Sequence, residues 1–453
     1  MNKLPTFDDH LGPLESVIAA AKAAGATAAD AIIAEDSALS IGTRLNKIEK
    51  CEQAESGSLG LRVFVGQQSA TIATNDLRQF NARDFADRAV TMARVAPADE
   101  FSGLADQSLL AQEIYPVDSV DPTFALDAAE LQRWCDTMEG EALAVAGVTN
   151  SNGAEASASR SRFTLMTSTG FAASRETTDY GMFVQIVATG DDGRMVRDYD
   201  YTSAVYKTDL KDAASIGHSA GQRAARQRGA QVAETMKDIP VIFDYRAARS
   251  LLGHLLGAIN GGSVALKRSF LAGKLNEMIF NKNITILDEP HLPRGPRSRP
   301  FDAEGLATRP MALVQDGVLK NYLLNLHAAR QLGMVPTGHA VRGVASQPGA
   351  SASNVTLLPG SLSPEELRRD IKRGLFVTDL IGSGVNGVTG DYSRGANGFL
   401  IENGELTQPV TEITIAGTLQ HMFRELVAAN DLMRETGMDS PSLRVDGMVL
   451  AGR

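Results

Sequence analysis

The chain has 453 residues, of which 43% are hydrophobic and 22% are charged, and its formal net charge at pH 7 is −10. This length and composition are typical of a globular protein with two or three domains and exclude a largely disordered chain. The acidic balance, with interspersed lysines and arginines, argues against a dominant nucleic-acid-binding surface. Two cysteines, Cys51 and Cys135, are too few for a disulfide framework and indicate a reducing compartment.

The sequence carries no sign of secretion or of a membrane span. Residues 1–10 contain no apolar stretch of the kind that a signal peptide needs, and no later segment approaches about 18 uncharged apolar residues. We therefore expect a cytoplasmic protein that binds neither a membrane nor nucleic acid.

The first half of the chain predicts two copies of one pattern, which is a helix, several strands and a second helix. In the first copy, over about residues 1–100, apolar residues recur at helical spacing up to Gly25. Strands are expected at Ala31–Ile33 and Leu61–Val65, and a helix returns over Leu77–Val95.

The second copy covers about residues 123–230 and begins with a helix over Ala128–Val145. Its strands are expected around Phe163–Met166 and Phe183–Val187, and its last helix over Asp209–Arg228.

A change of composition at Asp238 divides the chain into an N-terminal domain, 1–237, and a C-terminal domain, 238–453. The second domain opens with a strand, an N-cap at Asp244 and a helix over Arg246–Asn260, and then becomes β-rich. The predicted fold class is α+β, with a helix–strands–helix repeat followed by a mostly antiparallel β domain with a few helices.

Turns and loops punctuate the second domain. Asp316-Gly317 and Asn403-Gly404 are typical of hairpin turns. Pro290–Pro300 combines four prolines with three arginines, and Pro336–Ser353 is rich in glycine and serine. The arginines could meet an acidic partner, but we expect the first segment to be a solvated loop and the second to be mobile.

One segment, Gly382-Ser383-Gly384-Val385-Asn386-Gly387, matches the dinucleotide-binding pattern G-x-G-x-x-G after a predicted strand. Such a site needs a following helix whose first N–H groups hold the pyrophosphate. Here glycines continue to Gly398 and a hairpin turn follows, so no helix can begin there. We do not expect a nucleotide site.

The same region resembles the PmbA branch, also called TldE, of the TldD/PmbA family of peptidase subunits and modulators of DNA gyrase. The resemblance rests on segments in the family's order: Gly57–Val63, Leu251–Gly261, Arg299–Gly305, Gly384–Gly395 and Ile401–Gly404. In the zinc-bearing TldD branch, the second of these segments carries H-E-x-x-x-H on a helix, and a cysteine near the C-terminus completes the metal site.

On that motif, this sequence has Gly253 at the first histidine, His254 at the glutamate and Ala258 at the second histidine, and no cysteine follows Cys135. The resemblance therefore implies a chain with no catalytic residues, no metal ligands and no cofactor of its own, with zinc only on a TldD-like partner. The positions of the histidines also argue against a zinc site on this chain. A helical zinc site most simply uses histidines at i and i+4, and the seven histidines include no such pair.

Three residues are candidates for contact with a peptide or a partner. His254 lies between an apolar stripe and a small-residue stripe of its predicted helix, where a packed, hydrogen-bonded histidine is the simpler interpretation. Asp391 and Arg394, three residues apart in a predicted turn, could bind a peptide terminus or satisfy each other and nearby backbone groups.

The run Gly217-His218-Ser219-Ala220-Gly221 matches the G-x-S-x-G nucleophile elbow. That elbow needs a strand running directly into a sharp turn, whereas this run lies inside a predicted helix. We expect Ser219 in the middle of a helix whose small residues pack against a sheet. A hydrolase that pairs Ser219 with His218 is disfavoured, because adjacent helical residues face different directions.

The resemblance implies that TldD and PmbA chains act together as a zinc-dependent peptidase on small or unfolded peptides. We expect this chain to be the subunit that lacks the metal ligands and shapes the peptide cavity and the interface. The alternative is a homodimeric peptide-binding or regulatory interaction protein without peptidase activity. The identity of the peptide and the oligomeric state stay open.

Overall fold

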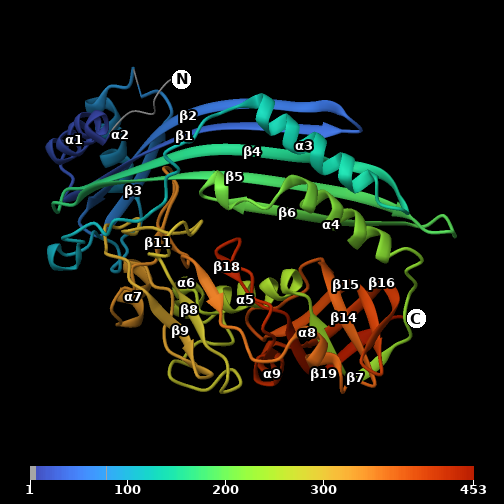
Figure 1. Cartoon of the computed structure of the whole chain (residues 1–453). Coiled ribbons are helices and arrows are strands. Elements are labelled where there is room, and N and C mark those ends of the chain that lie inside the picture. The colour runs from blue at the N-terminus through green and yellow to red at the C-terminus, as the bar shows by residue number, and fades with distance from the viewer. Residues whose placement is uncertain (1–6, 78) are drawn as a thin grey trace.

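The computed structural model describes residues 7–77 and 79–453, in which an arched sheet with its helices lies over a second body (Figure 1). Each copy of the predicted pattern supplies three strands between two helices. The first copy has α1 (Phe7–Ala23), β1 (Ala28–Arg44), β2 (Lys47–Val65), β3 (Gln68–Thr74) and α2 (Ala82–Val95), and the second has α3 (Ala128–Leu143), β4 (Val148–Thr167), β5 (Ala172–Thr189), β6 (Met195–Ala204) and α4 (Ala213–Arg226). The helix–strands–helix repeat of the predicted α+β class is confirmed.

The six strands form one antiparallel sheet in the order β3-β2-β1-β4-β5-β6, so the two copies share it. The strands are far longer than predicted, because β1, β2, β4 and β5 have 17, 19, 20 and 18 residues. Serine, glycine and alanine fill much of β4, a composition with little β propensity. Pairing with β1 and β5 along its length holds this segment extended.

Successive side chains of β1 point to opposite faces of the sheet. One face is covered by helices, and the other meets the second half of the chain. Ile33 packs in the apolar cluster of α1 and α2, and Ile41 packs in the cluster of α3 and α4. Ile32 points the other way, into a cluster with Phe301. The sheet therefore lies between a helical layer and the C-terminal half.

The helices α3 and α4 approach each other closely through glycine. A Cβ on Gly217 would lie 2.1 Å from the carbonyl oxygen of Met138, and a Cβ on Gly221 would lie 2.8 Å from that of Ala142. The prediction that these small residues pack against a sheet is wrong for the two glycines, which face a neighbouring helix backbone. Ala220 does join the apolar cluster that α4 shares with the sheet.

The second half of the chain contributes the remaining helices and strands. They are β7 (Met236–Phe243), α5 (Tyr245–Ala258), α6 (Gly261–Ala265), β8 (Ile286–Asp288), β9 (Met311–Gln315), β10 (Val318–Leu319), α7 (Leu326–Leu332), β11 (Ala340–Val341), β12 (Gly349–Ala350), β13 (Val355–Leu357), α8 (Pro364–Arg368), β14 (Arg373–Ile381), β15 (Asp391–Glu402), β16 (Glu405–Thr418), α9 (Leu419–Glu425), β17 (Val427–Ala428), β18 (Met438–Asp439) and β19 (Leu443–Ala451).

These strands form a closed barrel and a smaller sheet. The barrel strands follow one another as β16-β15-β14-β7-β19, and β16 pairs again with β19 to close the ring. The smaller sheet has the order β10-β9-β8-β13-β18. The strand pairs β7–β14 and β13–β18 are parallel, whereas their neighbours in both sheets pair antiparallel, as predicted.

Both predicted hairpin turns are present. Asp316 and Gly317 have φ values of 50° and 79° between β9 and β10, and Asn403 and Gly404 have values of 50° and 84° between β15 and β16. Left-handed φ at both central residues defines the turn whose twist suits a two-residue hairpin. Across residues 7–77 and 79–453, every helix is too short or too polar to span a bilayer.

The segment Pro336–Ser353 is an ordered junction between the two halves rather than a mobile loop. Its strands β11 and β12 pair with each other. Its Arg342 forms an ion pair with Asp30 of β1 at 2.8 Å, and both side chains are almost fully buried. A Cβ on Gly60 of β2 would lie 2.0 Å from the carbonyl oxygen of Val344, so the segment packs directly on the sheet.

The proline-rich segment Pro290–Pro300 forms a second junction. Arg294 pairs with Asp118 at 3.3 Å and with Asp209 at 3.0 Å, both in the N-terminal half. Arg299 is only 7% exposed. The expectation of a solvated loop is therefore wrong, because Arg294 pairs with the N-terminal half and Arg299 is buried.

A buried cluster of charges holds the sheet against the second half. Asp30 lies 2.5 Å from Arg62 and 2.8 Å from Arg342. Burial alone would raise the pKa of Asp30, but the two guanidinium groups outweigh it and lower that pKa. Glu304 lies in the same cluster, where burial, reinforced by the charge of Asp302, raises its pKa to about 7.

Replacing Glu304 with glutamine is expected to flatten the pH dependence of stability. A carboxyl group whose pKa rises from 4.5 to about 7 on folding adds stability below pH 4.5 that is lost as the pH rises through 7. Between pH 5 and pH 8 the wild-type protein should lose about 2 kcal/mol of unfolding free energy relative to Glu304→Gln. Urea unfolding across this range measures the difference, and parallel curves for the two proteins would contradict it.

Candidate functional site

The helix α5, which carries the candidate residues, begins directly after the barrel strand β7. The Asp244 carboxylate accepts a hydrogen bond from the Arg246 N–H at 2.9 Å, which confirms the predicted N-cap. Leu251 and Leu255 are buried on the apolar stripe of the helix. The Arg246 side chain reaches Asp198 of β6 at 3.0 Å, so α5 lies where the sheet meets the barrel.

His254 packs edge-on against Tyr392 of β15, with ring centroids 5.9 Å apart. Burial, and then the charge of Arg394, lowers the pKa of His254, which keeps the imidazole neutral near pH 7. Its Nε2 is buried without a hydrogen-bond partner in the described part of the chain. The structure thus brings two of the three candidates, His254 and Arg394, into one neighbourhood.

Asp391 and Arg394 lie on strand β15 rather than in the predicted turn. Residues three apart on a strand point to opposite faces, so the pair cannot meet. Asp391 Oδ2 accepts a hydrogen bond from Thr389 Oγ1 at 2.6 Å, and Arg394 Nη2 donates to the Leu380 carbonyl oxygen at 3.3 Å. Each residue bonds to its own neighbours, although Arg394 Nε is buried without a hydrogen-bond partner in the described chain, and the two do not form a joint site.

The residues at the positions of the TldD metal ligands do not fit a zinc ion. Gly253 has no side chain, and a Cβ there would lie 4.0 Å from Met438 Cε. Ala258 is buried and carries no donor atom. His254 alone offers a nitrogen, and the positive charge of Arg394 acts against a cation beside it.

Glu435 and Asp439 lie within three residues of Met438 in the sequence, but both face cations of the protein. Glu435 lies 3.1 Å from Arg249 and also pairs with Lys211, and Asp439 lies 3.9 Å from Arg249. Within residues 7–77 and 79–453, no three side chains of His, Cys, Asp or Glu are grouped to hold one ion. We therefore derive no catalytic step through a metal on this chain.

Rebuilding the motif by Gly253→His, His254→Glu and Ala258→His is expected to give weak zinc binding and no peptide hydrolysis. Positions five apart on a helix differ in direction by ~140°, and α5 ends at Ala258. A third protein ligand would also be missing, since Met438 is the residue that faces position 253. Zinc titration and a peptide assay with and without chelator test this, with Gly253→His alone as the control. Chelator-sensitive cleavage by the triple variant would contradict our account of the missing chemistry.

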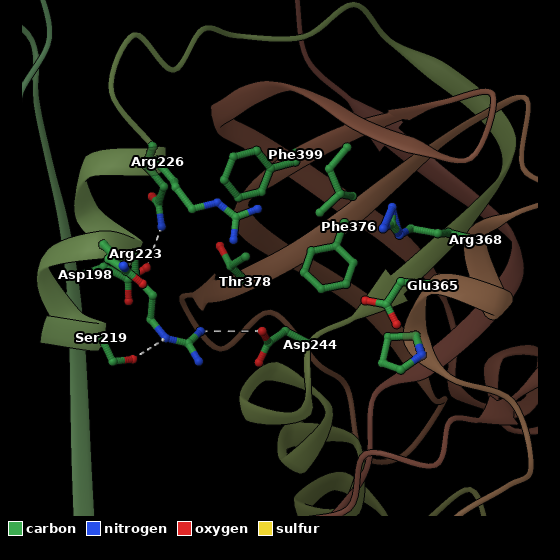
Figure 2. Close-up of a pocket in the computed structure, with 14 residues that line it drawn as sticks. Asp198, Ser219, Arg223, Arg226, Asp244, Glu365, Arg368, Phe376, Thr378 and Phe399 are labelled. Carbon is green, nitrogen blue, oxygen red and sulfur yellow. Dashed lines mark hydrogen bonds and ion pairs between the residues drawn. The ribbon is translucent and has the colours of Figure 1, made fainter. Parts of the chain in front are cut away.

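A cavity of about 390 Å³ opens between α4 and the barrel (Figure 2). Ser219 lies in the middle of α4, as predicted, and its Oγ is 3.4 Å from Arg223 Nε. His218 instead contacts Gln222 on the same helix at 2.8 Å. Ser219 therefore faces a guanidinium group, and this geometry excludes a Ser219–His218 nucleophile–base pair.

Several charged groups of this cavity have a partner within the protein. Asp244 forms an ion pair with Arg223 at 3.6 Å, which a dashed line marks in Figure 2, and Asp198 is held by Arg246. Arg226 lies over the ring of Phe399 at 5.4 Å. Sequence reasoning missed this cavity, because α4 and the barrel strands that line it are far apart in the chain.

Comparison with known proteins agrees with this architecture. Three family models match successive parts of the chain: PmbA/TldA metallopeptidase domain 1 over residues 29–93, the central domain over 121–228 and the C-terminal domain over 236–452. Among solved structures, a candidate DNA gyrase modulator from Bacteroides thetaiotaomicron superposes with a TM-score of 0.91 and 28% identity, covering 99% of this chain and 100% of that one. TldE from Thermococcus kodakarensis shares the fold, with a TM-score of 0.83 and 20% identity over 97% and 99% of the two chains.

Sequence relatives match over nearly the whole length. The metalloprotease PmbA homolog of Haemophilus influenzae is 32% identical over 437 residues, which is 95% of this chain and 93% of that protein. Metalloprotease PmbA of Escherichia coli O157:H7 is 32% identical over 426 residues, or 94% and 92% of the two chains. With the matched domains in the same order and the same fold, the chain belongs to the PmbA/TldD family.

Proposed function

We propose that this chain is a PmbA-like, or TldE-like, subunit of a zinc-dependent peptidase that acts on small or unfolded peptides. One observation carries the proposal: at the positions of the TldD ligands, Gly253 and Ala258 lack donor atoms and His254 stands alone. The zinc and the hydrolytic step then belong to a TldD-like partner. The name metalloprotease, which the relatives carry, would describe such a complex rather than each of its chains.

In this proposal the chain contributes peptide-binding surface where its sheet and helices meet its second half. Strand β18 lies at an edge of the smaller sheet, and its Met438 faces Gly253 of α5. An extended peptide that adds to such an edge is held by backbone hydrogen bonds and so can have many sequences. This mode of binding suits a peptidase of unfolded peptides.

The second half also offers a surface for a partner. Ile381 and Val388, which flank the glycine-rich segment after β14, are each 54% exposed. A contiguous exposed apolar surface is typical of protein contacts, and we propose that these two side chains belong to such a surface. Cys51 and Cys135 are both free thiols, which suits work in the cytoplasm.

The test mixes the purified chain with a TldD-like chain from the same genome that carries H-E-x-x-x-H. We expect one complex in size-exclusion chromatography with light scattering, and chelator-sensitive hydrolysis of an unfolded peptide that neither this chain alone nor the chelated mixture shows. A chain that forms only homodimers and binds peptides without any gain in hydrolysis would favour the regulatory alternative. Hydrolysis by this chain alone would contradict the proposal.

A further inference from the structure

A second cavity, of about 450 Å³, lies between the sheet and the proline-rich junction. Residues of β1, β4 and β5 line one side, and residues 296–300 line the other. Four arginines border it, against two carboxylates, Asp36 and Glu176. This excess of positive charge sets the cavity apart in a chain whose net charge is −10.

The protein itself uses only part of this positive charge. Glu176 is held by ion pairs with Arg160 and Arg162. Asp36 lies at the exposed rim. Three arginines are left, Arg175 of β5 and Arg297 and Arg299 of the junction, and none of them forms an ion pair within the described residues.

Arg299 is the most deeply placed of the three. It is 7% exposed, and Nη2 donates to the Ser351 carbonyl oxygen at 2.5 Å, while Nε is buried without a hydrogen-bond partner in the described chain. Asp288 and Asp302 act on it only at a distance. Asp288 is already engaged by His339 and by the Ser353 N–H.

Arg175 is held by rings rather than by a carboxylate. Its guanidinium lies 4.8 Å from the ring centre of Phe163 and 6.0 Å from that of Phe301. Burial, and then the like charge of Arg299, lowers the pKa of Arg175 to about 10. Two neighbouring cations withdrawn from water carry a large desolvation penalty, which attraction to an anion in the cavity would offset.

The cavity borders the chain segment that leads to the position of the family's metal motif. The Arg297 side chain lies against Gly437, because a Cβ there would be 3.0 Å from Arg297 Cγ. The next residue, Met438, faces Gly253 of α5. Gly437 and Met438 are adjacent in the chain, so one short segment joins the border of the cavity to the position of the metal motif.

We propose that Arg175, Arg297 and Arg299 form a carboxylate-binding subsite that holds one end or one acidic side chain of a bound peptide. The inference rests on the proposed function, because it takes the ligand of the cavity to be a peptide. The planar guanidinium fork matches a carboxylate with two hydrogen bonds, and Phe163 keeps the Arg175 fork oriented. Pro296, Pro300 and Ala352 give the cavity apolar walls that suit the rest of a peptide residue.

The test uses fluorescence anisotropy with an N-terminally labelled, alanine-based decapeptide in three forms: free C-terminal acid, C-terminal amide, and the amide with one internal glutamate. We expect the wild-type chain to bind at least one carboxylate-bearing form about tenfold or more tightly than the plain amide. A preference for the free acid identifies a terminal carboxylate, and a preference for the glutamate peptide identifies an acidic side chain. Either preference supports the subsite.

Arg175→Met and Arg299→Met should abolish this preference while leaving the melting temperature of the peptide-free protein unchanged or higher, because each removes a buried cation that forms no ion pair with a carboxylate of the described chain. A structural role alone would lower the melting temperature. Arg194→Gln, which changes an exposed arginine of the β5–β6 hairpin, is the matched control and should keep the preference.

Two results would overturn the inference in distinguishable ways. Equal binding of all three peptides by the wild-type chain would remove the subsite and leave the proposed function standing, whereas no binding of any peptide would count against both. Competition by inorganic phosphate with an affinity equal to that of the best peptide would show a phosphate site instead.

Discussion

Replacing Gly217 with alanine is expected to lower the free energy of unfolding by about 2–4 kcal/mol. The new Cβ would lie 2.1 Å from the carbonyl oxygen of Met138 and 2.8 Å from its carbonyl carbon, so α3 and α4 must separate or shift. Backbone atoms in a packed helix pair move only together, and the apolar cluster beneath them loses contacts. Chemical unfolding followed by circular dichroism measures the change.

Gly140 provides the matched control on the facing helix. No atom lies within 4 Å of a Cβ built there, and the residue has an ordinary helical backbone in α3. Gly140→Ala should therefore raise the free energy of unfolding, by up to about 1 kcal/mol, through helix propensity. Equal effects of the two substitutions would show that the close approach of α3 and α4 does not govern stability.

Replacing Asp30 with asparagine is expected to destabilise the protein by about 3–5 kcal/mol. Asp30 is fully buried between Arg62 and Arg342, which are themselves almost fully buried. Without the Asp30 charge, Arg62 and Arg342 are two adjacent buried cations. Of the carboxylates in the cluster, Glu304 then remains near Arg62. The junction between the sheet and Pro336–Ser353 should open first, and hydrogen exchange of that segment should rise with the loss of stability.

A second substitution distinguishes the electrostatic cost of Asp30→Asn from any loss of packing. Arg342→Met on the Asp30→Asn background removes one of the surplus cations and keeps an apolar side chain in its place, so part of the lost stability should return. Arg342→Met alone should be destabilising, because it removes one of the two counter-charges of Asp30. Additive effects of the two single substitutions would contradict the coupling.

The sequence is sufficient to predict the helices and the tight turns of this fold. Leu14, Val17 and Ala21 are buried at the predicted spacing in α1, and Asp244 caps α5 as expected. Asn403 and Gly404 adopt the predicted left-handed turn. These features depend on neighbours within a few residues, which is why local pattern is enough.

The long strands and the two junctions depend instead on distant partners. Much of β4 is serine, glycine and alanine, and only its pairing with β1 and β5 makes it a strand. The local sequence predicts a mobile segment for Pro336–Ser353. The contacts that hold the segment in place come from β1 and β2, which are distant in the sequence. No local signal marks such contacts.

The candidate site shows the same division. The family motif and the helical pattern point to His254, but its proximity to Arg394 depends on the packing of α5 against β15. A separation of three residues suggests a joint site for Asp391 and Arg394, whereas the strand turns them to opposite faces. The arginines of the carboxylate subsite come from β5 and from the proline-rich junction, so only the three-dimensional structure could bring Arg175 and Arg299 together.

Elemental analysis of the chain, purified without chelator, measures whether this chain has a metal centre of its own. We expect far less than one zinc per chain, both for the wild-type protein and for His254→Ala, since Gly253 and Ala258 provide no ligands. A metal-to-protein ratio near one that is lost on His254→Ala would contradict this expectation.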